Sequence, residues 1–172
     1  MPKNHNKKPK QQQTESTITK PTDENKTGFP IVGIGASAGG LNAFKTFFTH
    51  MPDKSHMAFV LVPHLDPNHQ SLMVELLSKH TAMPVREITE NMPVKPNHVY
   101  IIPPAKYLEI HHSKLQLINP PEKRGTETAI DNFFRYLAED QEERAIGIIR
   151  SGTGLHGSTG LQASKAYCAI AI

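Results

Sequence analysis

The chain has 172 residues, a formal net charge of +3 and a single cysteine, Cys168. This length suits one domain with a tail, and one cysteine excludes an intrachain disulfide. The longest apolar runs, such as residues 58–62, are far too short to cross a bilayer, and no apolar segment follows the basic N-terminus as a signal peptide requires. We therefore expect a cytoplasmic protein without membrane insertion.

The first 28 residues differ in composition from the rest of the chain. They contain six lysines and three acidic residues, which account for the whole formal charge of +3. Because this stretch has almost no apolar side chains, residues 1–28 are predicted to form a disordered basic tail, and residues 29–172 to form the domain. The domain itself is balanced in charge, so it lacks the excess of positive charge that nucleic-acid binding needs. We expect no nucleic-acid partner.

From residue 29 onward, short apolar runs alternate with longer amphipathic segments. The short runs predict buried strands, and apolar residues at helical spacing predict helices. The segment 71–80 is expected to be a helix with Leu72, Leu76 and Leu77 on one side. In chain order, the predicted elements are a strand at 31–35, a helix at 41–50, a strand at 58–63, a helix at 71–80, an extended segment at 84–89, a strand at 98–104, a hairpin over 107–118, a helix at 128–140, a strand at 145–150, a glycine-rich loop at 151–160, a helix at 161–167 and a strand from 168.

Fully apolar strands that alternate with helices predict an α/β fold, with a mainly parallel, doubly wound sheet covered by helices on both faces. In such folds, ligands bind beyond the carboxyl ends of the strands, where the loops from strand to helix gather. Three loops qualify here, at residues 35–40, 63–70 and 151–160. We therefore expect any chemistry to lie in these three loops.

The first loop has two possible chemical interpretations. The pattern Gly33-x-Gly35-x-x-Ala38 matches a dinucleotide-binding fingerprint. The pattern Gly35-x-Ser37-x-Gly39 matches a nucleophile elbow, in which small neighbours allow a sharp turn that exposes the serine hydroxyl. A tight turn without chemistry is the third possibility, and the loop by itself does not decide among the three.

The second loop favours the nucleophile. A dinucleotide site needs a carboxylate at the end of the second strand, whereas this strand ends at His64, a residue type suited to a general base. One βαβ unit separates Ser37 from His64, so the two are expected on neighbouring parallel strands at the same edge. A solvated loop histidine is the alternative. Neither His69 nor the pair His111–His112 forms a convincing ligand set, so no metal is expected.

The third loop contains no acidic residue to orient a histidine base. Its glycines, Gly152, Gly154, Gly157 and Gly160, allow close approach of the backbone to a negative group such as an oxyanion. The position at which an acid is expected holds His156.

Together, these segments resemble the CheB protein-glutamate methylesterase family, and most closely the CheB-like domain fused to chemotaxis CheR methyltransferases. The resemblance covers residues 30–172. It implies a mainly parallel sheet and cofactor-free hydrolysis of glutamyl methyl esters. It also implies methylated chemoreceptor tails as partners, together with a CheR-type methyltransferase. It rests on GIGASAGGL, AFVLVPHLDPNHQSLMVELLSKHTAMPV, MPVKPNHVYIIPP, IDNFFRYLAEDQEERAIGII and SGTG-x-x-G.

The resemblance assigns roles to individual residues. The family's catalytic serine matches Ser37 and its catalytic histidine matches His64, while the position of its catalytic aspartate holds His156. Backbone N–H groups near Ala38 and Gly39, with Gly154 in the third loop, are expected to hold the oxyanion.

The chain departs from the family pattern in further ways. The pattern continues past Ile172 with a complete strand and a segment that shapes the substrate cleft, so the domain is expected to be incomplete at its C-terminus. No receiver domain precedes it, so we expect no phosphorylation switch. Asp66 and Asp131 are alternatives for the missing acid.

Three hypotheses for function stay open. The first is a serine methylesterase whose activity is weak because His156 replaces the acid. The second is a catalytically crippled relative that acts as a binding module or has no function. The third is a nucleotide-binding module, which rests on the glycine spacing alone.

Overall fold

The computed structural model of the chain describes residues 27–36, 40–63, 72–120, 128–150 and 169–171. Within these residues, six strands form one parallel sheet in the order β3-β5-β2-β1-β8-β9. The predicted α/β fold with a mainly parallel sheet is confirmed. The strands are β1 (Ile31–Ala36), β2 (Ala58–Pro63), β3 (Val85–Glu87), β5 (His98–Ile101), β8 (Ala145–Arg150) and β9 (Ala169–Ala171).

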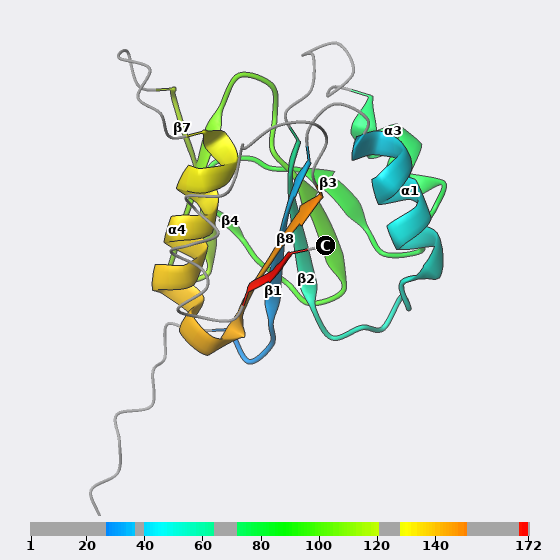
Figure 1. Ribbon diagram of the computed structural model, residues 1–172, viewed down its shortest axis with the longest axis horizontal. Helices are drawn as coiled ribbons and strands as arrows, with labels where there is room; N and C mark the ends of the chain where they lie inside the picture. Colours follow the sequence, from blue (N-terminus) through cyan, green and yellow to red (C-terminus); the bar gives the residue numbers. More distant parts are fainter. Residues whose placement is uncertain (1–26, 37–39, 64–71, 121–127, 151–168, 172) are drawn as a thin grey trace, which may run out of the picture.

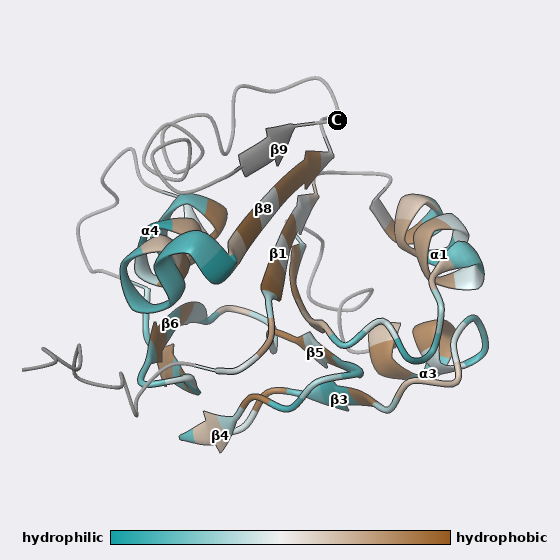
Figure 2. Cartoon of the chain, turned by 90° about the horizontal axis from the view of Figure 1, so that it is seen from below, coloured by the Kyte–Doolittle hydropathy of each residue, from teal (hydrophilic) through white to brown (hydrophobic). Residues whose placement is uncertain are grey.

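Helices cover both faces of this sheet, as Figures 1 and 2 show. Helices α1 (Gly40–His50) and α3 (Met73–Ser78) lie on one face, and α4 (Ala129–Gln141) lies on the other. A single 3₁₀ turn (Glu142–Arg144) joins α4 to β8. Among the described residues, no helix is both long and apolar enough to cross a membrane.

The alternation of side chains along β1 divides the core into two halves. Ile31 packs on the α4 side of the sheet, whereas Val32 and Ile34 pack on the side of α1 and α3. Because β1 is buried on both faces, its sequence is apolar throughout instead of alternating with polar residues. This explains why the strand could be predicted from a short apolar run.

A second, smaller sheet lies beside α4 and has the strand order β4-β7-β6. Strands β6 (Tyr107–His111) and β7 (Lys114–Ile118) form the predicted hairpin. Its turn residues, His112 and Ser113, have φ angles of 49° and 60°, as a two-residue turn of the type that matches strand twist requires. Strand β4 (Met92–Pro93) pairs with β7 and was not predicted.

The predicted apolar side of the helix at 71–80 is wrong at Leu72, which does not belong to the helix. Helix α3 begins only at Met73, and its buried side chains are Met73 and Leu77. Leu72 precedes the helix and is 53% exposed, while Leu76 is partly buried. Residues four apart share a helix face, so Met73 and Leu77 face the core together. The predicted apolar side included Leu72, which lies one residue before the start of the helix.

This correction predicts different costs for two leucine substitutions. Leu77→Ala removes a side chain with no exposed surface and should lower the free energy of unfolding by about 2–5 kcal/mol. Leu72→Ala should change it by about 0.5 kcal/mol or less, because a surface residue leaves no cavity. Urea unfolding followed by circular dichroism measures both. Equal losses for the two variants would contradict the assignment of the buried face.

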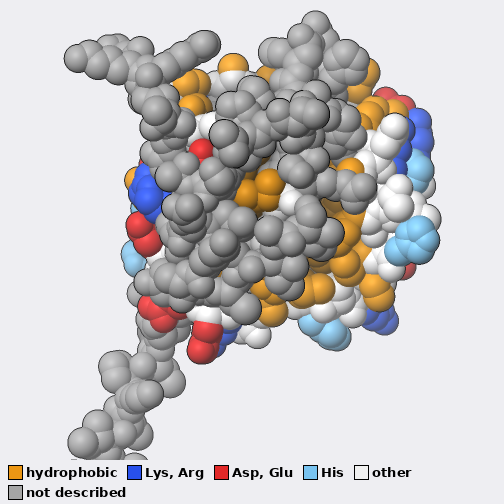
Figure 3. Space-filling model, in the orientation of Figure 1, with side chains coloured by type: hydrophobic (Ala, Val, Ile, Leu, Met, Phe, Trp, Pro, Cys, Tyr) orange, Lys and Arg blue, Asp and Glu red, His pale blue; other side chains and the backbone are white. Residues whose placement is uncertain are grey.

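The surface along α4 carries both signs of charge. In Figure 3, acidic and basic side chains lie close together on the side of the molecule where α4 runs. Arg135 Nη1 lies 3.9 Å from Glu139 Oε1, one helical turn along. Among the described residues, the surface along α4 is therefore not uniformly basic.

The described fold begins slightly before the expected domain boundary. Thr27 is 8% exposed, and its hydroxyl lies 2.7 Å from Oε1 of the fully buried Gln141 in α4. The backbone oxygen of Thr27 accepts a hydrogen bond from the guanidinium of Arg144. The division into a tail and a domain at residue 29 stays a prediction, and the buried contacts begin two residues earlier.

Candidate active site

Three neighbouring strands end at the same level of the sheet. Strand β1 lies between β2 and β8, and its last residue, Ala36, is paired with Pro63 on one side and Arg150 on the other. Each of the three predicted loops begins within one residue of one of these strand ends. The carboxyl ends of parallel strands are where α/β proteins place their sites, so this row of three marks the candidate active site.

The predicted site residues themselves lie outside the described residues. Ser37 follows Ala36 by one peptide bond, and His64 follows Pro63 in the same way. The other members of the predicted set, also outside the described residues, are Ala38, Gly39, Gly154 and His156. Their side-chain positions and roles stay predictions, whereas the alignment of the strand ends that precede them is observed.

The segment after β1 has the local context that a nucleophile elbow requires. Strand β1 ends at Ala36 and α1 begins at Gly40, so only three residues, 37–39, connect strand to helix. Such a short connection demands small side chains. The first backbone N–H groups of a helix have no partner within the helix, so the start of α1 can supply donors to a negative charge at this edge.

The glycines before this turn have a packing role. Gly33 and Gly35 lie inside β1 on the face that α4 covers. A Cβ atom added at Gly33 would lie 2.9 Å from Phe134 Cε1, and one at Gly35 would lie 2.5 Å from Ile130 Cγ2. In a dinucleotide fingerprint, the first glycine forms the turn after the strand. Since both glycines are accounted for by the close approach of α4, the nucleotide interpretation loses its main support.

Asp131, one of the two alternative acids, serves to cap a helix. It is 3% exposed and lies in the first turn of α4. Its Oδ2 accepts hydrogen bonds from Thr128 N at 3.1 Å and Thr128 Oγ1 at 2.7 Å, and Asp131 N donates to Thr128 Oγ1 at 3.1 Å. This reciprocal pair is a capping box, which satisfies backbone groups at the helix start. Asp66 lies outside the described residues.

The strand pairing adds a residue for which no role was predicted. Arg150 is the last residue of β8 and is paired with Ala36, immediately before the candidate nucleophile. The available signal was its position as the first charged residue after a continuous apolar run. The backbone of Arg150 thus marks the third strand end at the level of the candidate site.

The CheB methylesterase family model matches residues 32–172. The chain belongs to the CheB methylesterase family. Among curated members, the protein-glutamate methylesterase/protein-glutamine glutaminase 2 of Xanthomonas oryzae pv. oryzae is 33% identical over 135 residues, which cover 76% of this chain and 37% of that protein. A protein with the corresponding putative name from Leptospira interrogans is 28% identical over 145 residues, covering 84% of this chain and 75% of that protein.

The fold is also that of a CheB domain. The crystal structure of the Thermotoga maritima CheB methylesterase catalytic domain superposes with a TM-score of 0.74 at 24% identity, covering 84% of this chain and 79% of that one. The resemblance to the CheB family that the sequence motifs carried is thus confirmed, as is the fold it implied. The chain spans well under half the length of the Xanthomonas proteins that it matches.

Proposed function

We propose that this chain hydrolyses the methyl esters of glutamate side chains on proteins, with a serine as nucleophile, in chemotaxis-type signalling. The observation that carries the proposal is the alignment of Ala36, Pro63 and Arg150 at the ends of adjacent strands. It supports a site in which the residues after β1 and β2 act on the same ester. Family membership and the names of the relatives support the choice of reaction.

In the proposed mechanism, Ser37 Oγ attacks the ester carbonyl carbon while His64 accepts the hydroxyl proton. Backbone N–H groups at Ala38 and Gly39, assisted by the loop at Gly154, hold the oxyanion of the tetrahedral intermediate. The intermediate then collapses, and methanol leaves with the proton from His64. A water molecule that gives a proton to His64 hydrolyses the acyl-serine, which releases the glutamate side chain and restores Ser37.

The proposed substrates are methylated cytoplasmic tails of chemoreceptors, so the proposed location is the cytoplasm. The esters on these tails are those that a CheR-type methyltransferase forms, and this enzyme is the proposed functional counterpart of the chain. No cofactor or metal takes part in the proposed reaction.

A second candidate function follows from one residue. His156 occupies the position of the family's catalytic aspartate, and a neutral imidazole carries no negative charge to stabilise the imidazolium that His64 becomes. A chain with too little activity to matter would act as a binding module for receptor tails. The two candidates differ in whether Ser37 contributes to turnover.

The deciding experiment measures methanol release from methylated receptor by the natural chain and by Ser37→Ala. We expect Ser37→Ala to reduce the rate to the residual level that substrate binding and the oxyanion hole sustain, because the nucleophile of a catalytic triad is worth on the order of 10³-fold or more. Ser78→Ala, on the exposed side of α3, is the matched control and should leave the rate unchanged. Equal rates for the natural chain and Ser37→Ala would favour the binding module.

A further inference from the structure

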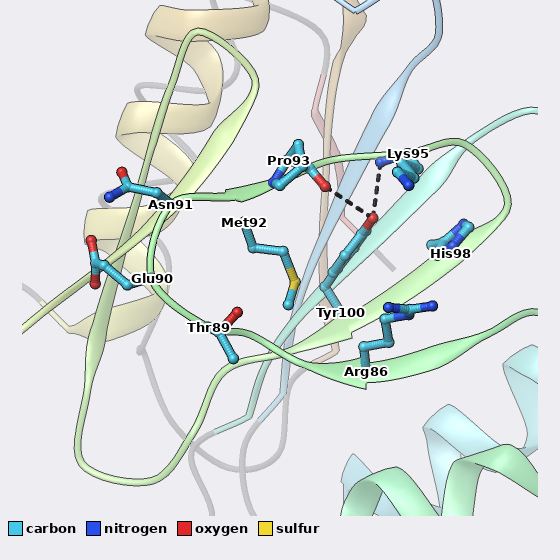
Figure 4. A pocket seen from close by; sticks show the side chains of 9 residues that line it. All are labelled: Arg86, Thr89, Glu90, Asn91, Met92, Pro93, Lys95, His98 and Tyr100. Atoms are coloured by element: carbon cyan, nitrogen blue, oxygen red, sulfur yellow. Dashed lines mark hydrogen bonds between the residues drawn. The ribbon is translucent and has the colours of Figure 1, made fainter.

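A pocket of about 280 Å³ lies between the edge strand β3, the strand β5 and the segment that contains β4 (Figure 4). It is remote from the candidate active site along the sheet. His98 in its lining is paired with Ala58, the first residue of β2, whereas the candidate site follows the last. Its lining consists of Arg86, Thr89, Glu90, Asn91, Met92, Pro93, Lys95, His98 and Tyr100.

Hydrogen bonds hold the wall of this pocket in place. Tyr100 is 1% exposed, and its hydroxyl accepts from Lys95 N at 2.9 Å and donates to Pro93 O at 3.4 Å. Val94 N, between these two residues, donates to Ser113 O at 3.0 Å. The segment opposite β5 is thus fixed by side-chain and backbone bonds from two sheets, so the pocket is formed before any ligand enters.

The charge inside the pocket is positive. Arg86 is paired with Tyr100 across the two strands, and Figure 4 shows its guanidinium beside the Tyr100 ring. Among the described residues, no hydrogen bond or ion pair engages the side chain of Arg86 or Lys95. The carboxylate of Glu90 is directed elsewhere, since its Oε2 accepts from Leu117 N in β7 at 3.3 Å.

Tyr100 adds no negative charge, because burial raises the pKa of its phenol above the ordinary value of 10.0. Its ring and the thioether of Met92 form the apolar centre of the pocket (Figure 4). The His98 ring stacks on Tyr100, with centroids 6.0 Å apart and planes at 17°. His98 Nδ1 lies 2.9 Å from Pro96 O, which can only accept, so Nδ1 donates this hydrogen bond.

We propose that this pocket binds a small organic anion, a carboxylate or phosphate on a compact planar apolar body. The planar guanidinium of Arg86 can hold two oxygens of such a group at once, and Lys95 supplies a second positive charge. The apolar body packs against Met92 and Tyr100. The proposal concerns binding alone, and no chemical step is assigned to this pocket. This proposal is independent of the proposed esterase activity.

The test titrates the ¹⁵N-labelled full chain with benzoate, phenyl phosphate and the neutral analogue benzamide, followed by amide chemical shifts. We expect saturable shifts at residues 86–100 with at least one of the anions, with a Kd on the order of 1 mM for ligands of this size. Benzamide should bind at least tenfold more weakly. The tighter of the two anions identifies the preferred group as carboxylate or phosphate.

A charge-removing variant makes the test specific. Arg86→Gln/Lys95→Gln should weaken binding of the preferred anion by about tenfold or more. Both side chains are exposed, so the variant keeps the fold. Lys114→Gln, an exposed lysine of β7 outside the pocket, is the matched control and should leave the affinity unchanged. The proposal is overturned by equal affinities for benzoate, phenyl phosphate and benzamide, by an unchanged affinity in the double variant, or by no saturable shift at tenfold the expected Kd.

Discussion

We expect His156→Asp to raise the rate of methyl-ester hydrolysis by roughly 10²–10⁴-fold over the natural chain. In a serine–histidine pair, the base becomes a positively charged imidazolium as the nucleophile attacks. A carboxylate beside it holds the imidazole in the correct tautomer and stabilises that charge. In serine proteases, replacing this aspartate by asparagine lowers kcat by about 10⁴-fold.

The expected range extends below the protease value because of what a histidine retains. A neutral imidazole at position 156 can accept a hydrogen bond, so it can still select the tautomer of His64. What it lacks is the negative charge. The gain from His156→Asp therefore measures the stabilisation of the imidazolium separately from its orientation.

Two controls make this result interpretable. His156→Asn has a hydrogen-bonding side chain without charge and should bring little or no gain. His156→Asp in the Ser37→Ala background should be inactive, because the acid acts through the serine. The readout is methanol release under single-turnover conditions, which reports the chemical step. If the Asp and Asn variants have the same rate, position 156 does not carry the acid.

Much of this fold could be predicted because its central strands are apolar on both faces. The strands at 58–63 and 145–150 have the predicted bounds, since a parallel strand buried between two layers of helices must be a continuous apolar run. Strand β4 has two residues, one of them Pro93, and so gives no such run. Its pairing with β7 depends on the hairpin that follows much later in the chain, which local patterns do not report.

The glycines of β1 illustrate a limit of motif analysis. In the sequence, the spacing of Gly33 and Gly35 is compatible with a phosphate-binding turn. In the structure, they lie within the strand and face Ile130 and Phe134 of a helix about one hundred positions away. A glycine needed for close packing and a glycine needed for a turn look the same in a sequence. Only the residue that packs against it in the folded protein distinguishes the two roles.

For the candidate site, the sequence predicted which strand ends lie side by side. The βαβ spacing placed the residues after β1 and β2 at one edge, and the pairing of Ala36 with Pro63 agrees with that expectation. The pairing of Ala36 with Arg150 brings the third loop to the same level. The role of Asp131 was not predictable in the same way, because a carboxylate three residues after a threonine suits both a cap and an acid.

The close packing of α4 on β1 makes stability sensitive to a substitution at Gly35. A methyl group added at Gly35 would lie 2.5 Å from Ile130 Cγ2, closer than real Cβ contacts come. Gly35→Ala should therefore lower the free energy of unfolding by about 1–3 kcal/mol, since an overpacked core must shift helix or side chain. The reduced freedom of the unfolded chain favours alanine by about 0.4–1 kcal/mol, so the steric cost outweighs it.

A second substitution at the contact tests whether this clash is the cause. Ile130→Ala removes the methyl group that Gly35→Ala would meet, and by itself it should cost about 2–5 kcal/mol through the cavity it leaves. In the double variant, the new methyl group partly fills that cavity. The total loss should then fall short of the sum of the two single losses by about 1 kcal/mol or more. Gly28→Ala is the matched control, because a Cβ atom there has no neighbour within 4 Å. The free energies of unfolding from urea titrations would contradict this explanation in two cases: if the two single losses add strictly in the double variant, or if Gly28→Ala loses as much stability as Gly35→Ala. Glycine at position 35 would then matter for its backbone conformation and not for the space it leaves to α4.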